Sequence, residues 1–428
     1  MKKGFSWGGD VRLRYEGYSN AQTLSSSAAF NDRNYFRLRL RSWGTYNVSP
    51  ELGFFGRVSA EPRYWFHAGS IAAEGNEWKY ALVDNLNANW KTNASGMPLT
   101  VVVGRQDIQL GDQWLVSDGT PIDGSWTNHF DALRVSLEAK DIKTKFDVIA
   151  LNQQARPGDR LPILGRKGSY ALTEQDETGV ILYASNKSLK DTQLDGYLIY
   201  KGDKKVTSAG DNTDIYTFGA KASGTPATHW QYSAEGALQW GNRELAVTNP
   251  AITTVSRDVL AYGLNTKLTY LFKDALSNQV SLIGEYLSGD KPGSTDKDEM
   301  FDVLWGRYPR VGETWAAAYA TETSGRSSQY NNLIRLGATW SIAPTKTSSI
   351  AATYCALFAP QAVATRATNT ARFSGDGHFR GHMFQVVAKQ KFTSSLSGLL
   401  FAEVCPLGNY YTNRDMITFV RAEVLFSF

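Results

Sequence analysis

The chain has 428 residues, a hydrophobic content of 42%, an aromatic content of 12% and a formal net charge of +4 at pH 7. Two cysteines exclude a disulfide-rich scaffold, and the small net charge gives no sign of nucleic-acid binding. No run of about eighteen apolar residues occurs, which excludes a membrane-spanning helix but not a membrane barrel, whose alternating strands average out polar.

The N-terminus reads Met1-Lys2-Lys3-Gly4, and no apolar segment follows its basic residues, so this chain shows no secretory signal. We expect the signal peptide of an exported protein to have been removed. A cytosolic protein is the alternative.

Alternation of apolar and polar residues with period two starts near the N-terminus and continues through the chain. It is seen in Val11–Glu16, Phe36–Arg41, Trp230–Trp240, Leu260–Tyr270 and Ile350–Phe358. The runs exceed the usual globular strand of about five or six residues and suit a tilted membrane-spanning strand of about 9–11. Aromatic residues near the ends of several runs fit the two interfacial belts of a membrane barrel.

Short and long connections separate these runs. Asn47–Glu51 and Ile342–Thr345 are short. The long, polar connections are Ser19–Asp32, Ala68–Trp78, Arg156–Thr178, Arg243–Arg257, Gly289–Asp298 and Gln361–Gly377. We predict an all-β fold in which residues 1–428 form a single transmembrane antiparallel β-barrel of about 18 strands, with short periplasmic turns and long extracellular loops.

The final run, Val420–Phe428, has an apolar residue at every second position and ends on Phe428. This ending resembles the signal that the barrel insertion machinery of bacterial outer membranes reads. It predicts an outer-membrane location and contact with membrane lipids and lipopolysaccharide. The final strand of any β-protein is the alternative.

If the apolar residues face lipid, the polar residues between them line the lumen. The arginines predicted to line the pore are Arg12, Arg14, Arg37, Arg39, Arg41, Arg57, Arg134, Arg335 and Arg421. Arg37, Arg39 and Arg41 would form a basic stripe about 14 Å long. Such a stripe favours anions, because arginine binds carboxylates with two parallel hydrogen bonds. Alternatively, these arginines pair with neighbouring carboxylates such as Glu16 and Glu61.

We expect no catalytic site, cofactor or metal site. No histidine stands in a His-x-Ser context, and His378 and His382 lack a third zinc ligand in sequence. Asp290, Asp296 and Asp298 are consistent with either a calcium loop or a solvated acidic loop. Cys355 and Cys405 lie on strands separated by one other, about 10 Å apart, too far for a disulfide.

Three segments resemble the alginate-export family of outer-membrane porins: Val101–Trp114, which contains Gly104-Arg105-Gln106, then Phe130–Val135 and Phe301–Arg310. The resemblance implies an 18-stranded barrel with an electropositive constriction for an anionic polysaccharide and periplasmic export partners. It adds Arg105 to the pore-lining residues. Alginate, another acidic or neutral glycan and small anions remain open as solutes, and a structural or adaptor barrel plugged by its loops is the alternative function.

Overall fold

The computed structural model describes residues 3–69, 72–117, 129–156, 158, 160, 161, 163, 164, 171, 173–246, 254–323, 325–364, 366, 367 and 369–428. The predicted loops Ala68–Trp78, Arg156–Thr178, Arg243–Arg257 and Gln361–Gly377 each include residues outside these ranges. Among the described residues, no helix is long and apolar enough to cross a membrane.

The elements follow one another almost entirely as strands. The strands are β1 (Gly4–Ser19), β2 (Asp32–Asn47), β3 (Leu52–His67), β4 (Gly75–Ala94), β5 (Met97–Gln106), β6 (Phe130–Ala139), β7 (Thr144–Gln153), β8 (Gln175–Asn186), β9 (Thr192–Lys205), β10 (Asn212–Ala227), β11 (Trp230–Ala246), β12 (Thr254–Leu271), β13 (Gln279–Leu287), β14 (Lys297–Asp298), β15 (Leu333–Thr345), β16 (Ser348–Phe358), β17 (Phe379–Lys391), β18 (Leu396–Pro406) and β19 (Met416–Ser427). The helices are α1 (Glu313–Glu322) and the 3-10 turns η1 (Lys140–Ile142) and η3 (Thr370–Arg372).

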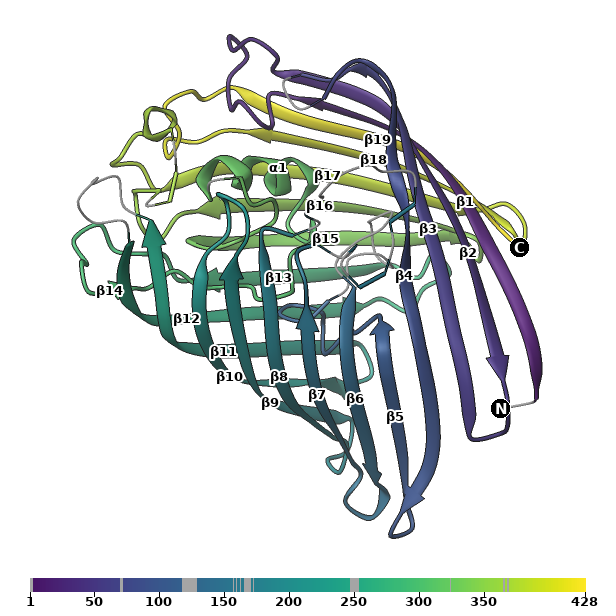
Figure 1. Cartoon of the computed structure of the whole chain (residues 1–428). Helices are drawn as coiled ribbons and strands as arrows, with labels where there is room; N and C mark the ends of the chain where they lie inside the picture. The colour runs from purple at the N-terminus through teal and green to yellow at the C-terminus, as the bar shows by residue number, and fades with distance from the viewer. Residues whose placement is uncertain are drawn as a thin grey trace.

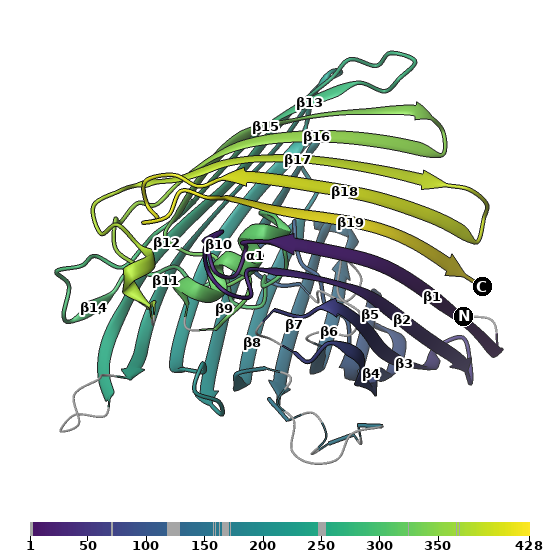
Figure 2. The ribbon, with the colours of Figure 1, turned by 90° about the horizontal axis from the view of Figure 1, so that it is seen from above.

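The strands close into one barrel. Each strand pairs antiparallel with its neighbours in the chain, β13 pairs with β15, and β1 pairs with both β2 and β19. The two-residue β14 pairs parallel with β12 and is not one of the strands that form the barrel wall. The remaining 18 strands form the closed wall that Figures 1 and 2 show, and they confirm the predicted fold.

The two faces of the wall differ as the alternation predicts. On β1, Val11 and Leu13 are 39% and 45% exposed, whereas the alternate residues Arg12 and Arg14 are each 3% exposed. Exposed aromatic side chains gather on the outer face near both ends of the strands: Trp7, Tyr46 and Trp90 at one end, and Phe66, Tyr216 and Tyr262 at the other. This is the distribution of an outer-membrane barrel.

The two ends of the barrel are unequal. Short turns such as residues 48–51, 95–96 and 346–347 join strands at one end, and the long connections lie at the other. Both chain termini lie at the end with the short turns, where Phe428 exchanges backbone hydrogen bonds with Gly9 (Figure 1). Because short turns are periplasmic in bacterial barrels, the long connections face the exterior.

Candidate functional site in the lumen

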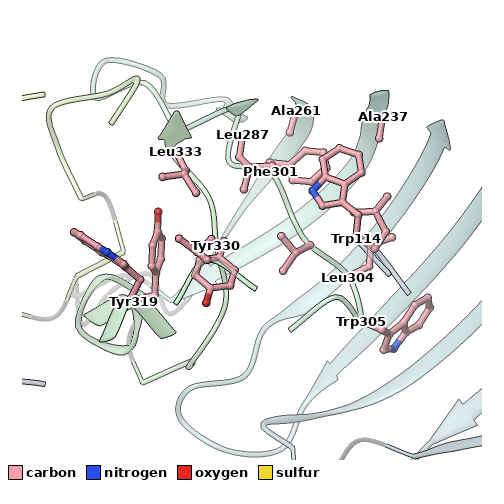
Figure 3. Close-up of a cluster of buried hydrophobic side chains, with 14 of the residues drawn as sticks. Trp114, Ala237, Ala261, Leu287, Phe301, Leu304, Trp305, Tyr319, Tyr330 and Leu333 are labelled. Atoms are coloured by element: carbon pink, nitrogen blue, oxygen red, sulfur yellow. The ribbon is translucent and has the colours of Figure 1, made fainter. Parts of the chain in front are cut away.

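The segment Glu299–Asn332, between β14 and β15, folds into the lumen. Figures 1 and 2 both show its helix α1 inside the ring of strands. Its side chains Trp305, Trp315, Tyr319 and Tyr330 are at most 2% exposed and belong to one apolar cluster. Figure 3 shows Trp305, Tyr319 and Tyr330 in this cluster. We call Glu299–Asn332 the plug.

A second inward loop, residues 107–117 after β5, packs against the plug. The Trp305 backbone N–H donates to the Leu115 carbonyl at 2.9 Å, and Trp114 stacks on Phe301 with ring centroids 5.4 Å apart. The Trp114 indole N–H also donates to Glu285 of β13 at 3.0 Å. The plug therefore sits on a loop that is itself tied to the wall.

Buried ion pairs attach the plug to the barrel around its circumference. Arg380 of β17 lies 2.6 Å from Glu322 of α1, and Tyr411 donates to the same carboxylate at 2.8 Å. Arg421 of β19 lies 2.7 Å from Glu313 at the start of α1. A buried pair of this kind becomes strongly destabilising when one partner is removed, because an unpaired charge remains.

On the other side of the plug, Arg307 forms two hydrogen bonds of 2.9 and 2.8 Å with Glu174, which precedes β8. Burial raises the pKa of Glu174, but the positive charge of Arg307 and its hydrogen bonds outweigh burial and lower that pKa to about 2. This carboxylate is therefore ionised at neutral pH.

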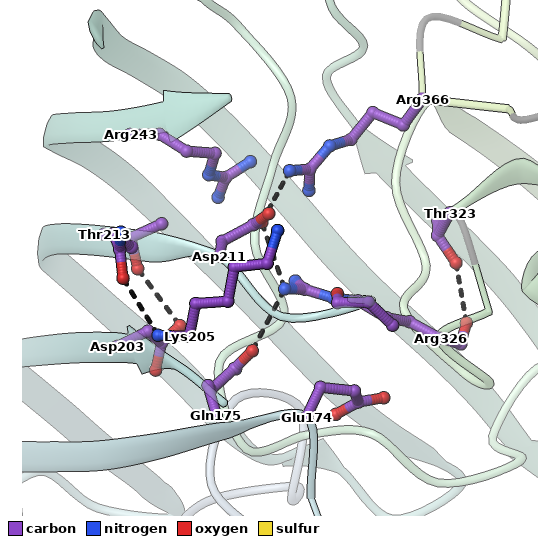
Figure 4. A network of polar contacts seen from close by, with 12 residues as sticks. Glu174, Gln175, Asp203, Lys205, Asp211, Thr213, Arg243, Thr323, Arg326 and Arg366 are labelled. Carbon is purple, nitrogen blue, oxygen red and sulfur yellow. Dashed lines mark hydrogen bonds and ion pairs between the residues drawn. The ribbon is translucent and has the colours of Figure 1, made fainter. Parts of the chain in front are cut away.

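A polar network continues from this anchor across the plug (Figure 4). Arg326 donates to Gln175 at 3.0 Å and lies 3.1 Å from Asp211, which also pairs with Arg366 at 2.5 Å. Arg243 of β11, 1% exposed, pairs with Asp302 of the plug at 3.0 Å. The plug is thus held by charge pairs as well as by its apolar cluster.

Beside the plug, arginines gather on the inner face of four adjacent strands. We call this group the arginine wall; its members are Arg12 and Arg14 of β1, Arg37, Arg39 and Arg41 of β2, Arg63 of β3 and Arg421 of β19. Their ion-pair partners are Asp10, Glu16, Glu61, Glu313 and Glu423. Among the described residues, the group contains seven guanidinium groups and five carboxylates, a difference of two positive charges.

The pairs explain how so many arginines share one surface. Arg39 and Arg41 lie 3.0 and 2.5 Å from the same Asp10, and Arg37 lies 2.9 Å from Glu61 and 3.7 Å from Glu16. The alternative weighed from the sequence, pairing with neighbouring carboxylates, therefore applies to each arginine. It does not neutralise the group as a whole.

The other predicted arginines lie apart from the arginine wall. All of them except Arg105 lie on the inner face. Arg57 pairs with Asp84 and Asp107, each at 2.8 Å. Arg134 pairs with Asp147 at 2.9 Å. Arg335 pairs with Glu285 at 3.0 Å, and Arg310 of the plug contacts the same carboxylate. Their role in selecting a solute remains a prediction.

Arg105 is the exception. It lies directly opposite Leu86 on β4 and Asp131 on β6. Directly paired residues share a face, and Leu86 is 48% exposed on the outer, lipid-facing surface. Arg105 therefore does not belong with the pore-lining residues. Strand parity could have revealed this, because Val101 and Val103 are apolar and residues two apart share a face.

The wall opposite β1 has the reverse charge balance. By strand order, β10 stands nine strands from β1 in both directions around the barrel. There Lys221 lies directly across from Asp195 of β9 and Glu235 of β11, and pairs with Asp112 of the inward loop at 2.5 Å. Three carboxylates thus surround Lys221, and Lys267 of β12 lines the same cavity as Asp112. No local sequence pattern predicts this cluster, because Asp112 reaches it from a distant loop.

Two cavities lie along the inner face of the wall. One, of about 510 Å³, is lined by Lys267, Tyr308, Arg310 and Arg335 together with small polar side chains. The other, of about 360 Å³, is lined by Arg134 and by polar residues of β4 and β5. Polar, charged surfaces of this kind suit a hydrated solute rather than an apolar ligand.

Solved outer-membrane porins share this architecture. The chain is similar to a BenF-like porin from Pseudomonas fluorescens, with a TM-score of 0.58, 10% identity, and coverage of 99% of this chain and 98% of that one. It is also similar to Pseudomonas aeruginosa OccK2 in complex with glucuronate (TM-score 0.56, 9% identity, 99% and 97% covered). A third is Pseudomonas aeruginosa OpdK with vanillate (TM-score 0.56, 12% identity, 99% and 100% covered).

No curated protein matches the chain by sequence. The structural likeness shows an outer-membrane porin fold. The model of the family described as alginate export matches residues 4–424, nearly the whole chain, in agreement with the resemblance seen in its motifs. The chain belongs to the alginate-export family, and it is a channel of the bacterial outer membrane.

Proposed function

We propose that this channel passes anionic solutes, with carboxylated sugars as the preferred class, along the arginine wall. The observation that carries the proposal is the excess of two positive charges among seven arginines and five carboxylates. Arginine suits this solute because its planar guanidinium binds a carboxylate through two hydrogen bonds. Fixed positive charge close to a narrow path also raises the local concentration of anions.

The ligands named for two structural neighbours support the same solute class. OccK2 is in complex with glucuronate, a carboxylated sugar, and OpdK is with vanillate, an aromatic carboxylate. The family description adds a polymer and a direction: export of an acidic, alginate-like polysaccharide. We propose that the channel exports such a polysaccharide from the cell.

A structural or adaptor role is the second candidate, and the plug favours it. Its aromatic side chains are buried, and ion pairs such as Arg380–Glu322 and Arg307–Glu174 hold it on several sides of the barrel. A plug that never moves would leave the barrel without a transport path. The two functions therefore differ in whether the plug opens.

Replacing Arg380 separates them. The change Arg380→Ala leaves the buried Glu322 carboxylate without its partner, which costs the closed plug about 3–5 kcal/mol. We expect ionic current through planar bilayers to rise in this variant, whereas Arg380→Lys, which keeps a positive charge, stays near the wild type. Glucuronate added to one side should carry current in the open channel, whereas neutral glucose should not.

The decisive outcomes are distinct. A channel whose open state passes glucuronate supports the proposal. If neither the wild type nor Arg380→Ala conducts, although both migrate as folded barrels in unheated gels, the adaptor role replaces it.

A further inference from the structure

The extracellular edge of the barrel steps down between β4 and β5. Strands β5, β6 and β7 have 10 residues each, whereas their neighbours β3 and β4 have 16 and 20. Figure 1 shows β4 continuing past the extracellular end of β5. Above that point the edge of β4 pairs with a loop instead, through two backbone hydrogen bonds of 3.0 and 2.8 Å between Ala81 and Leu164.

A groove of about 520 Å³ lies on the outer face at this step. Its floor is apolar, formed by Leu86, Val103, Leu133 and Ala150. Leu86, Val103 and Leu133 are 44–52% exposed, so they face the hydrocarbon of the membrane. Leu161 of the loop that follows β7 closes one side.

Charged groups line the extracellular end of the same groove. Arg105 donates to Asp131 at 2.8 and 3.1 Å and to the Val83 carbonyl at 2.8 Å. Arg160, from the loop, donates to the second Asp131 oxygen at 3.2 Å and also contacts Asn152. Ionised side chains on a lipid-facing wall are costly unless they are paired or reach the interface.

The charges of this cluster do not cancel. Among the described residues, two guanidinium groups share one carboxylate, which leaves one positive charge. The Arg105 side chain is 2% exposed, but the Arg160 side chain is 34% exposed at the mouth of the groove. A guanidinium has five N–H donors, and Arg160 uses three in its contacts with Asp131 and Asn152.

We propose that this groove binds one anionic membrane lipid, with an acyl chain against Leu86, Val103 and Leu133 and a headgroup phosphate on Arg160. The occupant follows from three facts: the groove belongs to the face that the bilayer covers, its floor is apolar, and its charged end is net positive. Because the charged end is the extracellular end of β5, the lipid belongs to the outer leaflet. This site is independent of the solute that the lumen carries.

Native mass spectrometry of the full chain tests the site. The protein is extracted from vesicles of phosphatidylcholine mixed with phosphatidylglycerol, and the lipid that stays bound is identified. Phosphatidylglycerol serves as the phosphate-bearing probe for the outer-leaflet lipid, and we expect the wild type to retain it. Arg160→Gln should retain about tenfold less, as expected for the loss of one charge-assisted hydrogen bond. Ala150→Trp, which fills the groove with a ring, should lose the lipid although every charge remains.

Arg156→Gln is the matched control, because Arg156 is exposed in the same loop but does not line the groove. It should retain the lipid as the wild type does, and unheated gels check that every variant is a folded barrel. Equal retention of phosphatidylcholine and phosphatidylglycerol by the wild type would overturn the headgroup assignment. Undiminished retention by both Arg160→Gln and Ala150→Trp would overturn the site.

Discussion

Two regions of the inner surface face each other across the lumen and differ in charge. The arginine wall on β19, β1, β2 and β3 comprises seven arginines, whose described ion-pair partners are five carboxylates. Around β10, on the opposite side, Lys221 stands among Asp112, Asp195 and Glu235. Both regions are hydrogen-bonded and mostly buried, so the difference between them is the sign of the uncompensated charge.

This separation of charge has a physical cost, because like charges held close together repel one another in a poorly screened interior. Packing alone does not explain it, since a polar interior could alternate the two signs evenly. We propose that the separation sets up an electric field directed across the lumen. Such a field would draw the anionic groups of a solute toward β1 and β2 and orient the solute as it passes.

The largest effect is expected from removing the excess on the arginine wall. The double change Arg39→Ala with Arg41→Ala removes two of the seven arginines. The five that remain equal the five carboxylates in number. We expect the permeability ratio of chloride to potassium to fall about fivefold, the equivalent of ~1 kcal/mol. The reversal potential in a salt gradient measures this ratio.

The pair Arg156→Ala with Arg414→Ala is the control for that change. It removes the same charge from exposed positions outside the barrel strands and should leave the reversal potential near that of the wild type. If the wall variant and this control behave alike, the excess charge of the arginine wall does not set selectivity.

A smaller effect is expected from acidification, through the plug anchor beside β8. The pKa of Glu174 is lowered to about 2 in the folded protein, because Arg307 outweighs the effect of burial, whereas its ordinary value is about 4.5. A carboxylate with a lowered pKa contributes stability that is present above its ordinary pKa and is lost as pH falls toward the folded value. The plug should therefore stay closed down to about pH 4 and loosen between about pH 4 and 2.

The frequency of channel openings as a function of pH measures this loosening. In Glu174→Gln, which cannot change charge at that position, the frequency should already be raised at pH 7 and should depend less on pH over the same interval. A wild-type plug that opens equally often at pH 3 and pH 6 would contradict the assigned anchor.

The smallest effect is expected on the opposite wall. Glu235 accepts a hydrogen bond from Tyr197 at 2.9 Å, and the change Glu235→Gln keeps an acceptor there while removing one negative charge. We expect anion preference to rise by about 1.5-fold to twofold, a change worth less than ~0.5 kcal/mol. A fall in anion preference would show that the two walls do not act as opposites.

The sequence predicted the barrel and most of the arginine wall because strand alternation is a local property. Arg12, Arg14, Arg37, Arg39 and Arg41 follow the two-residue period of their own strands, and this period fixes their face. The predicted set of inner arginines failed at Arg105, which was placed by its motif rather than by its parity with Val103.

Local sequence patterns predict neither the plug nor the carboxylate cluster around Lys221. The plug has no strand period, and its position depends on contacts with residues distant in sequence, such as Glu313 with Arg421 and Arg307 with Glu174. In the sequence, only its resemblance to the alginate-export family distinguishes the segment Phe301–Arg310. Its dense aromatic and arginine content, inside a connection longer than any other, was the one available signal that it folds inward.

The central claim is that the uncompensated positive charge of the arginine wall faces the path of the solute. The most direct measurement is the reversal potential of the wild-type channel in planar bilayers under a potassium chloride gradient at neutral pH. We expect a potential of the sign that marks chloride as the more permeant ion. A potential at zero or of the cation-selective sign, in a channel that conducts, would contradict it.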